Sequence, residues 1–198
     1  DYNGLKMVID GTTLAGYAIQ SLRARRERGD VATGAGHYRV HDVGGAYLDR
    51  IAHDVRLARP MRVAVDCGNG VAGAFAPTLF RRLGCDLVEL FCDVDGRFPN
   101  HHPDPSQPKN LADLTERLAR GDCEIGLAFD GDGDRLGVVT KDGHMIYPDR
   151  QLMLFAADVL SRVPGGTILF DVKCTQRLAP AIEAAGGKPL MYKTGHSL

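Results

Sequence analysis

The chain has 198 residues and a mass of 21.4 kDa, which suits one large domain or two small ones. Its 24 Lys and Arg against 25 Asp and Glu give a formal net charge of -1, which argues against a nucleic-acid-binding arm or an acidic tail. No run approaches the ~20 apolar residues of a membrane span, and the five cysteines, without a CxxC pair, predict buried thiols in the reducing cytoplasm and no zinc site.

The first 60 residues predict two helices separated by an irregular linker. A short strand is expected over 5–9, followed by a helix from about Thr13 to Arg28 with Thr12 as its N-cap. The Gly-rich stretch 30–42 is predicted to be a linker. A second helix is expected from about Val43 to Leu57, ahead of a proline.

From residue 61 onward, apolar runs alternate with stretches of helical periodicity. The predicted strands are 61–67, 85–92, 124–129, 136–140, 167–174 and 188–193. The predicted helices are 72–83, 111–119, 148–162 and 176–185, and the residues Lys141–His144 predict a hairpin turn. This alternation predicts an α/β fold with mixed, mostly parallel sheets flanked by helices.

An acidic loop follows the predicted strand that ends at residue 129. Its carboxylates Asp130, Asp132 and Asp134 alternate with glycines, which allow the loop to curl until the side chains converge. Three like charges this close call for a cation, and oxygen ligands suit Mg²⁺. The spacing does not fit an EF-hand, whose sixth and twelfth positions are here Arg135 and Lys141. The alternative interpretation of this loop is an exposed acidic turn without a metal. Arg135 could bind a phosphate group or form an ion pair with one of the aspartates.

A glycine pattern lies between the predicted strand 61–67 and the helix after it. Gly68, Gly70 and Gly73 match GxGxxG, with Asp93 about 20 residues further on, as in dinucleotide-binding proteins. A Rossmann-type NAD-dependent oxidoreductase is therefore an alternative function. The acidic loop has no role in hydride transfer, however, so the favoured interpretation is a tight strand–helix turn that needs small residues.

Several other polar residues lie next to predicted strands. Lys173 lies at the carboxyl end of the strand 167–174, the place where parallel sheets bind ligands. His196 follows the last predicted strand. His101 and His102 are adjacent in an extended loop, so their side chains point apart and predict structural contacts and not a metal site.

Motifs along essentially the whole chain resemble the α-D-phosphohexomutase superfamily. They are Asp1–Lys6, Val65–Gly70, Phe98–Pro105, Asp130–Arg135, Tyr147–Arg150, Asp171–Thr175 and Lys193–Ser197. The acidic hexapeptide is the specific mark of the superfamily. The His-His-Pro-Asp-Pro loop resembles the bacterial phosphomannomutase/phosphoglucomutase branch, with phosphoglucosamine mutase as an alternative within the superfamily.

The resemblance implies a piece of a four-domain enzyme. Residues 1–41 would be the C-terminal tail of the first domain, 42–145 the complete second domain with the metal-binding loop, and 146–198 the N-terminal half of the third. The implied reaction moves phosphate between the 1 and 6 positions of mannose or glucose phosphate through a phosphoserine and a 1,6-bisphosphate. Because the phosphoserine loop would precede Asp1, we expect these 198 residues alone to be inactive.

The resemblance also implies roles for individual residues. The implied Mg²⁺ ligands are Asp130, Asp132 and Asp134. Lys6, a residue without any signal of its own, would be a general acid/base, and Arg135 would lie beside the transferring phosphoryl group. Lys173 and His196 would contact the hexose phosphate. We expect no nucleic-acid or membrane partner, nothing in the sequence specifies an oligomeric state, and a non-catalytic metal- or phosphosugar-binding module is the remaining alternative.

Overall fold

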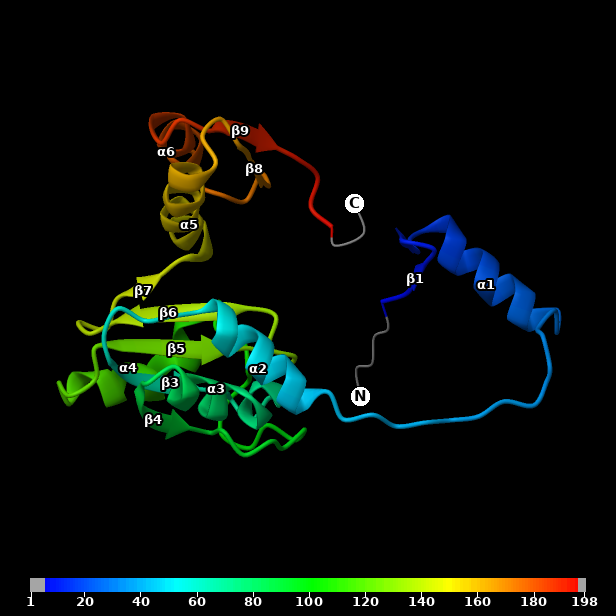
Figure 1. Ribbon diagram of the computed structural model, residues 1–198, viewed down its shortest axis with the longest axis horizontal. Helices are drawn as coiled ribbons and strands as arrows, with labels where there is room; N and C mark the ends of the chain where they lie inside the picture. Colours follow the sequence, from blue (N-terminus) through cyan, green and yellow to red (C-terminus); the bar gives the residue numbers. More distant parts are fainter. Residues whose placement is uncertain (1–5, 196–198) are drawn as a thin grey trace. The chain divides into compact units, whose positions relative to one another are not determined.

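The computed structural model describes residues 6–195 (Figure 1). These residues form two compact units. The larger unit consists of His41–Ile168 and Cys174–Pro189. The smaller unit consists of the described residues up to Val40, with Leu169–Lys173 and the described residues from Leu190 onward.

A five-stranded mixed sheet forms the centre of the larger unit (Figure 1). Its strands are β3 (Arg62–Asp66), β4 (Asp86–Leu90), β5 (Ile125–Phe129), β6 (Leu136–Thr140) and β7 (Met145–Ile146). They lie in the order β4-β3-β5-β6-β7. The central strand β3 pairs in parallel with β4 and β5, whereas β5, β6 and β7 pair antiparallel through hairpins, one of them the predicted Lys141–His144 turn. The α/β fold with a mixed sheet is thus confirmed, but the sheet is not mostly parallel as predicted: it has two parallel and two antiparallel strand pairs.

Helices cover both faces of this sheet. They are α2 (Gly44–Asp54), α3 (Ala76–Arg82) and α4 (Ala112–Ala119), with 3₁₀ turns η1 (Val71–Ala74) and η2 (Pro108–Leu111) before α3 and α4. Alternate residues of β3 point to opposite faces. Ala64 belongs to the core under α4, and Val63 and Val65 belong to the core with Ala76 of α3.

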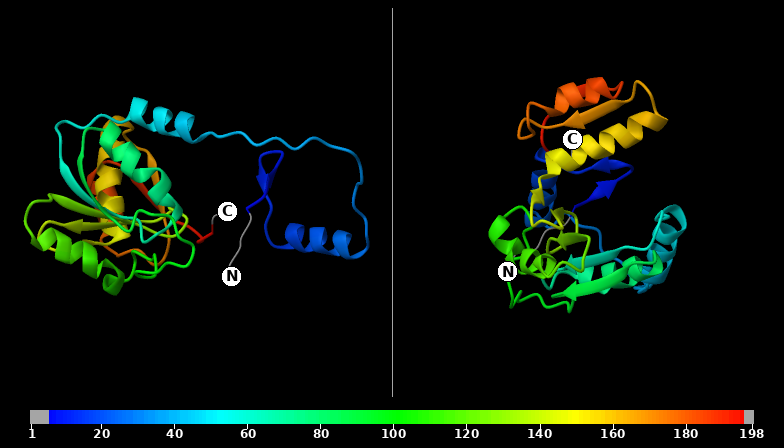
Figure 2. Two further views of the ribbon diagram at one scale, coloured as in Figure 1. Left: turned by 90° about the horizontal axis from the view of Figure 1, so that it is seen from below. Right: turned by 90° about the vertical axis from the view of Figure 1, so that its left-hand side faces the viewer.

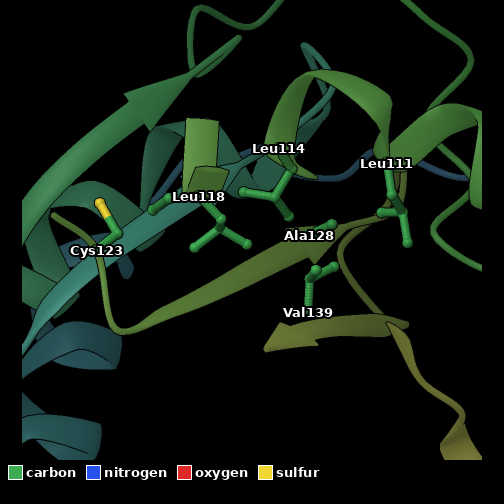
Figure 3. Packing of buried hydrophobic residues seen from close by; sticks show 7 residues of the cluster. Leu111, Leu114, Leu118, Cys123, Ala128 and Val139 are labelled. Atoms are coloured by element: carbon green, nitrogen blue, oxygen red, sulfur yellow. The ribbon is translucent and has the colours of Figure 1, made fainter. Parts of the chain in front are cut away.

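The core beneath α4 holds the most buried leucines of the sheet region. Leu111, Leu114 and Leu118 point from η2 and α4 onto Ala128 and Val139 of the central strands (Figure 3). Cys123 is buried in the same cluster and Cys67 is buried on the other face, as predicted, whereas Cys85, Cys92 and Cys174 are partly exposed.

The remaining elements of the C-terminal half form a small αβ arrangement. Helix α5 (Pro148–Arg162) has the predicted bounds and packs against α6 (Leu178–Ala184). The strands β8 (Thr167–Phe170) and β9 (Lys188–Met191) form a two-stranded sheet. Gln151 of α5 donates hydrogen bonds from its side chain to the carbonyl oxygens of Ile146 (2.8 Å) and Leu136 (3.4 Å), which ties α5 to the five-stranded sheet.

The N-terminal helix begins later than its sequence pattern predicts. Strands β1 (Val8–Ile9) and β2 (Thr12–Thr13) form an antiparallel hairpin, and α1 (Tyr17–Glu27) begins only after it (Figure 2). The prediction of Thr12 as an N-cap is wrong because Asp10 and Gly11 adopt positive φ angles of 48° and 73°, which turn the chain back. The β-branched threonines then pair as a strand.

Among the other boundaries that differ from prediction, three have a clear cause in the backbone. The predicted helix 72–83 is split into η1 and α3, because Phe75 between them has a non-helical backbone. Helix α2 ends at Asp54, before the extended Val55, and not near Leu57. Strand β8 ends at Phe170, and the next residue, Asp171, accepts a hydrogen bond from the backbone N–H of Lys173 that turns the chain.

None of the helices within residues 6–195 is long and apolar enough to cross a membrane.

Replacing Leu114 tests the core beneath α4. Leu114 is 0% exposed, so Leu114→Ala should lower the free energy of unfolding by about 2–5 kcal/mol, through lost burial and the cavity it leaves. Leu154→Ala, at a residue of α5 that is 69% exposed, is the control and should change it by less than about 0.5 kcal/mol. Urea denaturation of both variants measures the difference, and equal losses would contradict this packing.

Candidate functional site

The acidic loop joins the antiparallel strands β5 and β6. Phe129 pairs with Leu136, so the six residues between them form the hairpin connection. The backbone N–H of Asp130 donates to the carbonyl oxygen of Arg135 (3.3 Å), and that of Gly133 donates to the carbonyl oxygen of Asp130 (3.1 Å). These hydrogen bonds curl the loop tightly.

The three aspartates converge as the alternation with glycine predicts. One carboxylate oxygen each of Asp130, Asp132 and Asp134 lies within 4.8 Å of the others. Asp130 is 1% exposed, whereas Asp132 and Asp134 are exposed. The three carboxylates therefore offer oxygen ligands, one of them buried and two of them open to solvent. Such a set fits a hard divalent cation that also keeps water or phosphate ligands.

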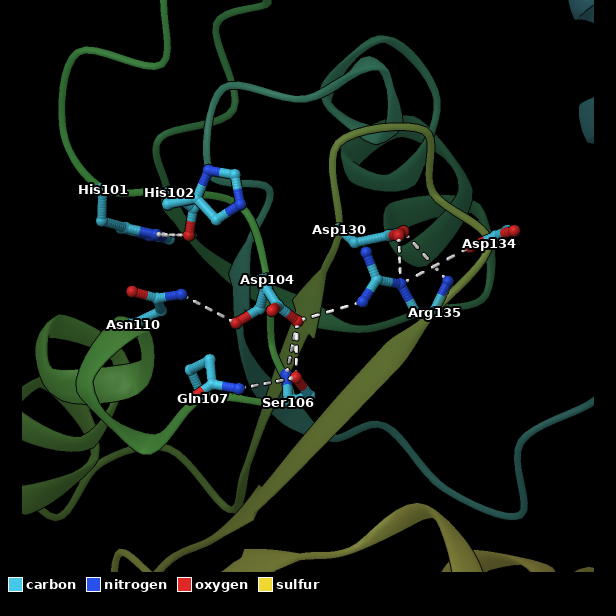
Figure 4. A network of polar contacts seen from close by, with 9 residues as sticks. All are labelled: His101, His102, Asp104, Ser106, Gln107, Asn110, Asp130, Asp134 and Arg135. Atoms are coloured by element: carbon cyan, nitrogen blue, oxygen red, sulfur yellow. Dashed lines mark hydrogen bonds and ion pairs between the residues drawn. The ribbon is translucent and has the colours of Figure 1, made fainter. Parts of the chain in front are cut away.

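Arg135 compensates the buried carboxylate of Asp130. Its Nε donates to Asp130 Oδ2 at 2.7 Å, and its backbone N–H donates to Oδ1 at 3.0 Å (Figure 4). Burial alone would raise the pKa of Asp130, but the hydrogen bonds and positive charge of Arg135 outweigh burial and lower this pKa. Asp130 therefore stays ionised although it is buried.

A second carboxylate, which the sequence did not single out, holds the other side of Arg135. Nη1 of Arg135 lies 3.1 Å from Oδ1 of Asp104 (Figure 4). Ser106 donates to the same oxygen from its hydroxyl (2.7 Å) and its backbone N–H (3.1 Å). These hydrogen bonds, and with them the positive charge of Arg135, lower the pKa of Asp104. The Asp-Pro-Ser pattern, typical of a turn capped by a side chain, is the only local signal that could have indicated this role.

The glycine pattern brings two stretches of backbone into close contact. A Cβ atom on Gly70 would lie 2.9 Å from the carbonyl oxygens of Asp130 and Gly131. A Cβ atom on Gly73 would collide with the carbonyl oxygen of Cys92. Both glycines are needed for packing against neighbouring loops, which supports the tight-turn interpretation over a dinucleotide fingerprint.

The other predicted site residues lie elsewhere in the chain. Lys173, expected at the end of a strand, lies instead in an exposed turn after β8, with its Nζ 3.1 Å from Oδ2 of Asp171. Lys6 is exposed and belongs with Lys173 to the smaller unit, whereas the aspartates and Arg135 belong to the larger one. His196 lies outside the described residues.

The two adjacent histidines have different surroundings. His101 turns toward the buried Asp66, with Nε2 3.1 Å from Oδ2, while the side chain of His102 is exposed. Neither histidine joins the group of potential metal ligands found among the described residues. The loop that carries them makes structural polar contacts.

Comparisons with known proteins show which proteins this chain is similar to. The family described as "Phosphoglucomutase/phosphomannomutase, alpha/beta/alpha domain II" matches residues 45–143. The chain is 57% identical over 198 residues to a phosphomannomutase/phosphoglucomutase of Pseudomonas aeruginosa and 62% identical over 199 residues to a phosphoglucomutase of Neisseria meningitidis. Both alignments cover 100% of this chain, and the chain spans 43% of the length of each relative.

A solved structure gives the same result. The crystal structure of a phosphoglucomutase/phosphomannomutase family protein from Burkholderia thailandensis superposes with a TM-score of 0.94 at 58% identity, covering 98% of this chain and 42% of that one. A putative phosphomannomutase from Thermus thermophilus superposes with a TM-score of 0.74 at 21% identity, over 93% of this chain and 44% of that one, and supports the fold.

The Asp130–Arg135 contact predicts a specific acid sensitivity. Because the pKa of Asp130 is lowered by folding, its ionised form stabilises the protein above the unfolded pKa, and this contribution is lost as the pH falls through the folded pKa. Asp130→Asn should therefore cost about 1.5–3 kcal/mol at pH 7, and its deficit relative to wild type should shrink as the pH falls toward 3. Asp142→Asn, at an exposed carboxylate in the next hairpin, is the control. A pH-independent deficit in Asp130→Asn would contradict the role of ionisation.

Proposed function

The chain belongs to the phosphoglucomutase/phosphomannomutase family, and from this premise we propose that the protein containing it is a phosphohexomutase. It would transfer phosphate between the 1 and 6 positions of a hexose phosphate, with mannose or glucose as the sugar. The observation that carries this proposal is the convergence of three aspartates beside Arg135, in the segment that the family match covers. The names of the relatives support the choice of sugars.

We also propose that residues 42–145 are the complete second domain of this enzyme. The family description refers to domain II and matches residues 45–143, which supports these bounds. Residues 1–41 would then end the first domain, and 146–198 would begin the third. A cytoplasmic enzyme of sugar phosphate metabolism is consistent with this assignment.

Asp130, Asp132 and Asp134 would hold the cation, which we propose to be Mg²⁺. When bound there, the cation would withdraw negative charge from a phosphoryl group. Asp130 stays ionised and fixed through Arg135, while the exposed Asp132 and Asp134 can adjust to a ligand. The guanidinium of Arg135, held by carboxylates on two sides, would present its remaining N–H groups to phosphate oxygens.

The proposed roles of the other residues rest on the family motifs. Lys6 would act as the general acid/base, and Lys173 and His196 would bind the hexose phosphate. The exposed ammonium group of Lys173 is accessible for this role, although it contacts Asp171 in the structure. Their replacement in the full-length protein should affect catalysis or substrate affinity without affecting cation binding.

Cation binding is the direct test in this chain. Titration with Mn²⁺, followed by electron paramagnetic resonance, should show one site that Asp132→Asn weakens at least tenfold, because even the loss of an outer-shell partner typically costs about that much. Asp142→Asn, an exposed Asp-Gly position in the next hairpin, is the matched control and should bind like wild type. Equal affinities of wild type and Asp132→Asn would contradict the proposed site.

Activity is tested in the full-length protein. A coupled assay should detect conversion of glucose 1-phosphate or mannose 1-phosphate to the 6-phosphate in the presence of Mg²⁺. We expect Asp132→Asn to lower kcat about 100-fold or more because charge on the phosphoryl group is no longer withdrawn. Full turnover by Asp132→Asn, or turnover that is unaffected by chelation, would contradict the mechanism.

A further inference from the structure

A buried carboxylate outside the acidic loop has a histidine as its main partner. Asp66 ends the central strand β3 and is 1% exposed. Its Oδ1 accepts a hydrogen bond from the backbone N–H of Gly68 at 2.8 Å. Nε2 of His101, 35 residues later, lies 3.2 Å from Oδ1 and 3.1 Å from Oδ2.

The hydrogen bonds of His101 require one proton more than a neutral imidazole with an ionised carboxylate provides. Nδ1 of His101 lies 3.0 Å from the carbonyl oxygen of His102, which can only accept. An ionised Asp66 can also only accept, yet a neutral imidazole has a single N–H. Both contacts are satisfied only when the pair holds an extra proton, either on the second ring nitrogen or on the carboxyl group.

The burial of Asp66 favours keeping this proton. Burial raises the pKa of Asp66, and the hydrogen bond from Gly68 and the interactions with His101 only partly offset this effect. The other charged group that acts on Asp66 is Asp113, whose negative charge raises this pKa further. The ring of His101 also packs edge-on against Phe91, with centroids 5.4 Å apart, which fixes its orientation.

Polar contacts connect the segment that begins with His101 to the acidic loop. The carbonyl oxygen of His102, which faces the His101 ring, also accepts from the backbone N–H of Asp104 at 2.8 Å. Asp104 in turn contacts Arg135, and Arg135 contacts Asp130 (Figure 4). A continuous series of polar contacts therefore joins the Asp66–His101 pair to the buried member of the aspartate cluster.

Packing gives a second connection between the same parts. Pro103 lies between the turn after β3 and the acidic loop, since Cβ atoms built on Gly68 and Gly131 would lie 2.9 Å and 3.3 Å from its ring atoms. The backbone N–H of Val71 also donates to the carbonyl oxygen of Gly131 at 3.1 Å. Movement of His101 would therefore be transmitted to the acidic loop.

We propose that Asp66 and His101 are positioning residues: their proton-sharing pair fixes the loop 101–104, which holds Arg135 and the aspartates in the arrangement that binds the cation. The part of this inference that concerns the cation rests on the proposed function. The part that concerns the positioning of Arg135 does not depend on that function.

The first test reads the protonation of the ring. In ¹⁵N spectra of the full chain at pH 7.5, Nδ1 of His101 should carry a proton, because it faces a carbonyl oxygen. His101→Gln identifies the signal by its disappearance. A His101 ring with a proton on Nε2 alone would overturn the proposal, because Nδ1 could not then donate to His102.

The second test measures the effect on the cation. His101→Ala should weaken Mn²⁺ binding about tenfold, the lower end of the effect of outer-shell partners. His101→Gln, whose side-chain amide can still donate to Asp66, should restore the affinity to within about threefold of wild type. His144→Ala, which removes an exposed ring from the hairpin after β6, is the control and should bind as wild type does. Equal Mn²⁺ affinity of His101→Ala and wild type, or no rescue by His101→Gln, would overturn the proposal.

A third measurement separates this inference from the proposed function. The Nε–H signal of Arg135 reports its contact with Asp130 without any metal. It should shift or broaden in His101→Ala and stay unchanged in His144→Ala. If wild type bound no Mn²⁺, the proposed function would fail while this signal still supported positioning; an unchanged signal in His101→Ala would overturn the inference itself.

Discussion

The structure around the candidate site depends on keeping one buried carboxylate ionised among like charges. Asp130 is excluded from solvent and lies near two further aspartates, so it needs both charge compensation and hydrogen bonds. Arg135 supplies both, from its guanidinium and its backbone. Asp104 holds the guanidinium from the other side, and Ser106 holds Asp104. A ligand set assembled in this way has one fixed and two adjustable members, which suits a cation that exchanges phosphate ligands.

The mixed sheet explains why these residues meet. Parallel neighbours β3 and β5 end at the same edge, so the turn after Asp66 lies beside the loop that begins at Asp130. The antiparallel return through β6 closes that loop into a hairpin and brings Arg135 back to Asp130. Small residues in the turn let the two backbones touch, which is why the GxGxxG pattern has a packing role here.

Local sequence signals predicted the elements well, whereas partners distant in sequence could not be predicted. The alternation of aspartate and glycine, the Lys141–His144 hairpin and the bounds of α5 follow from neighbouring residues alone. The predicted start of α1 is wrong because the turn at residues 10–11 competes with the helix propensity of the residues after it. The contacts of Asp104 with Arg135 and of Asp66 with His101 span 31 and 35 residues, and spacing in the chain carries no information about them.

The most direct measurement of the central claim is anomalous diffraction from crystals of this chain grown with Mn²⁺. We expect one strong anomalous peak in contact with carboxylate oxygens of Asp130, Asp132 and Asp134, with Arg135 still bound to Asp130. Three aspartate side chains turned away from one another, with no anomalous density between them, would contradict the claim that this loop is built around a cation.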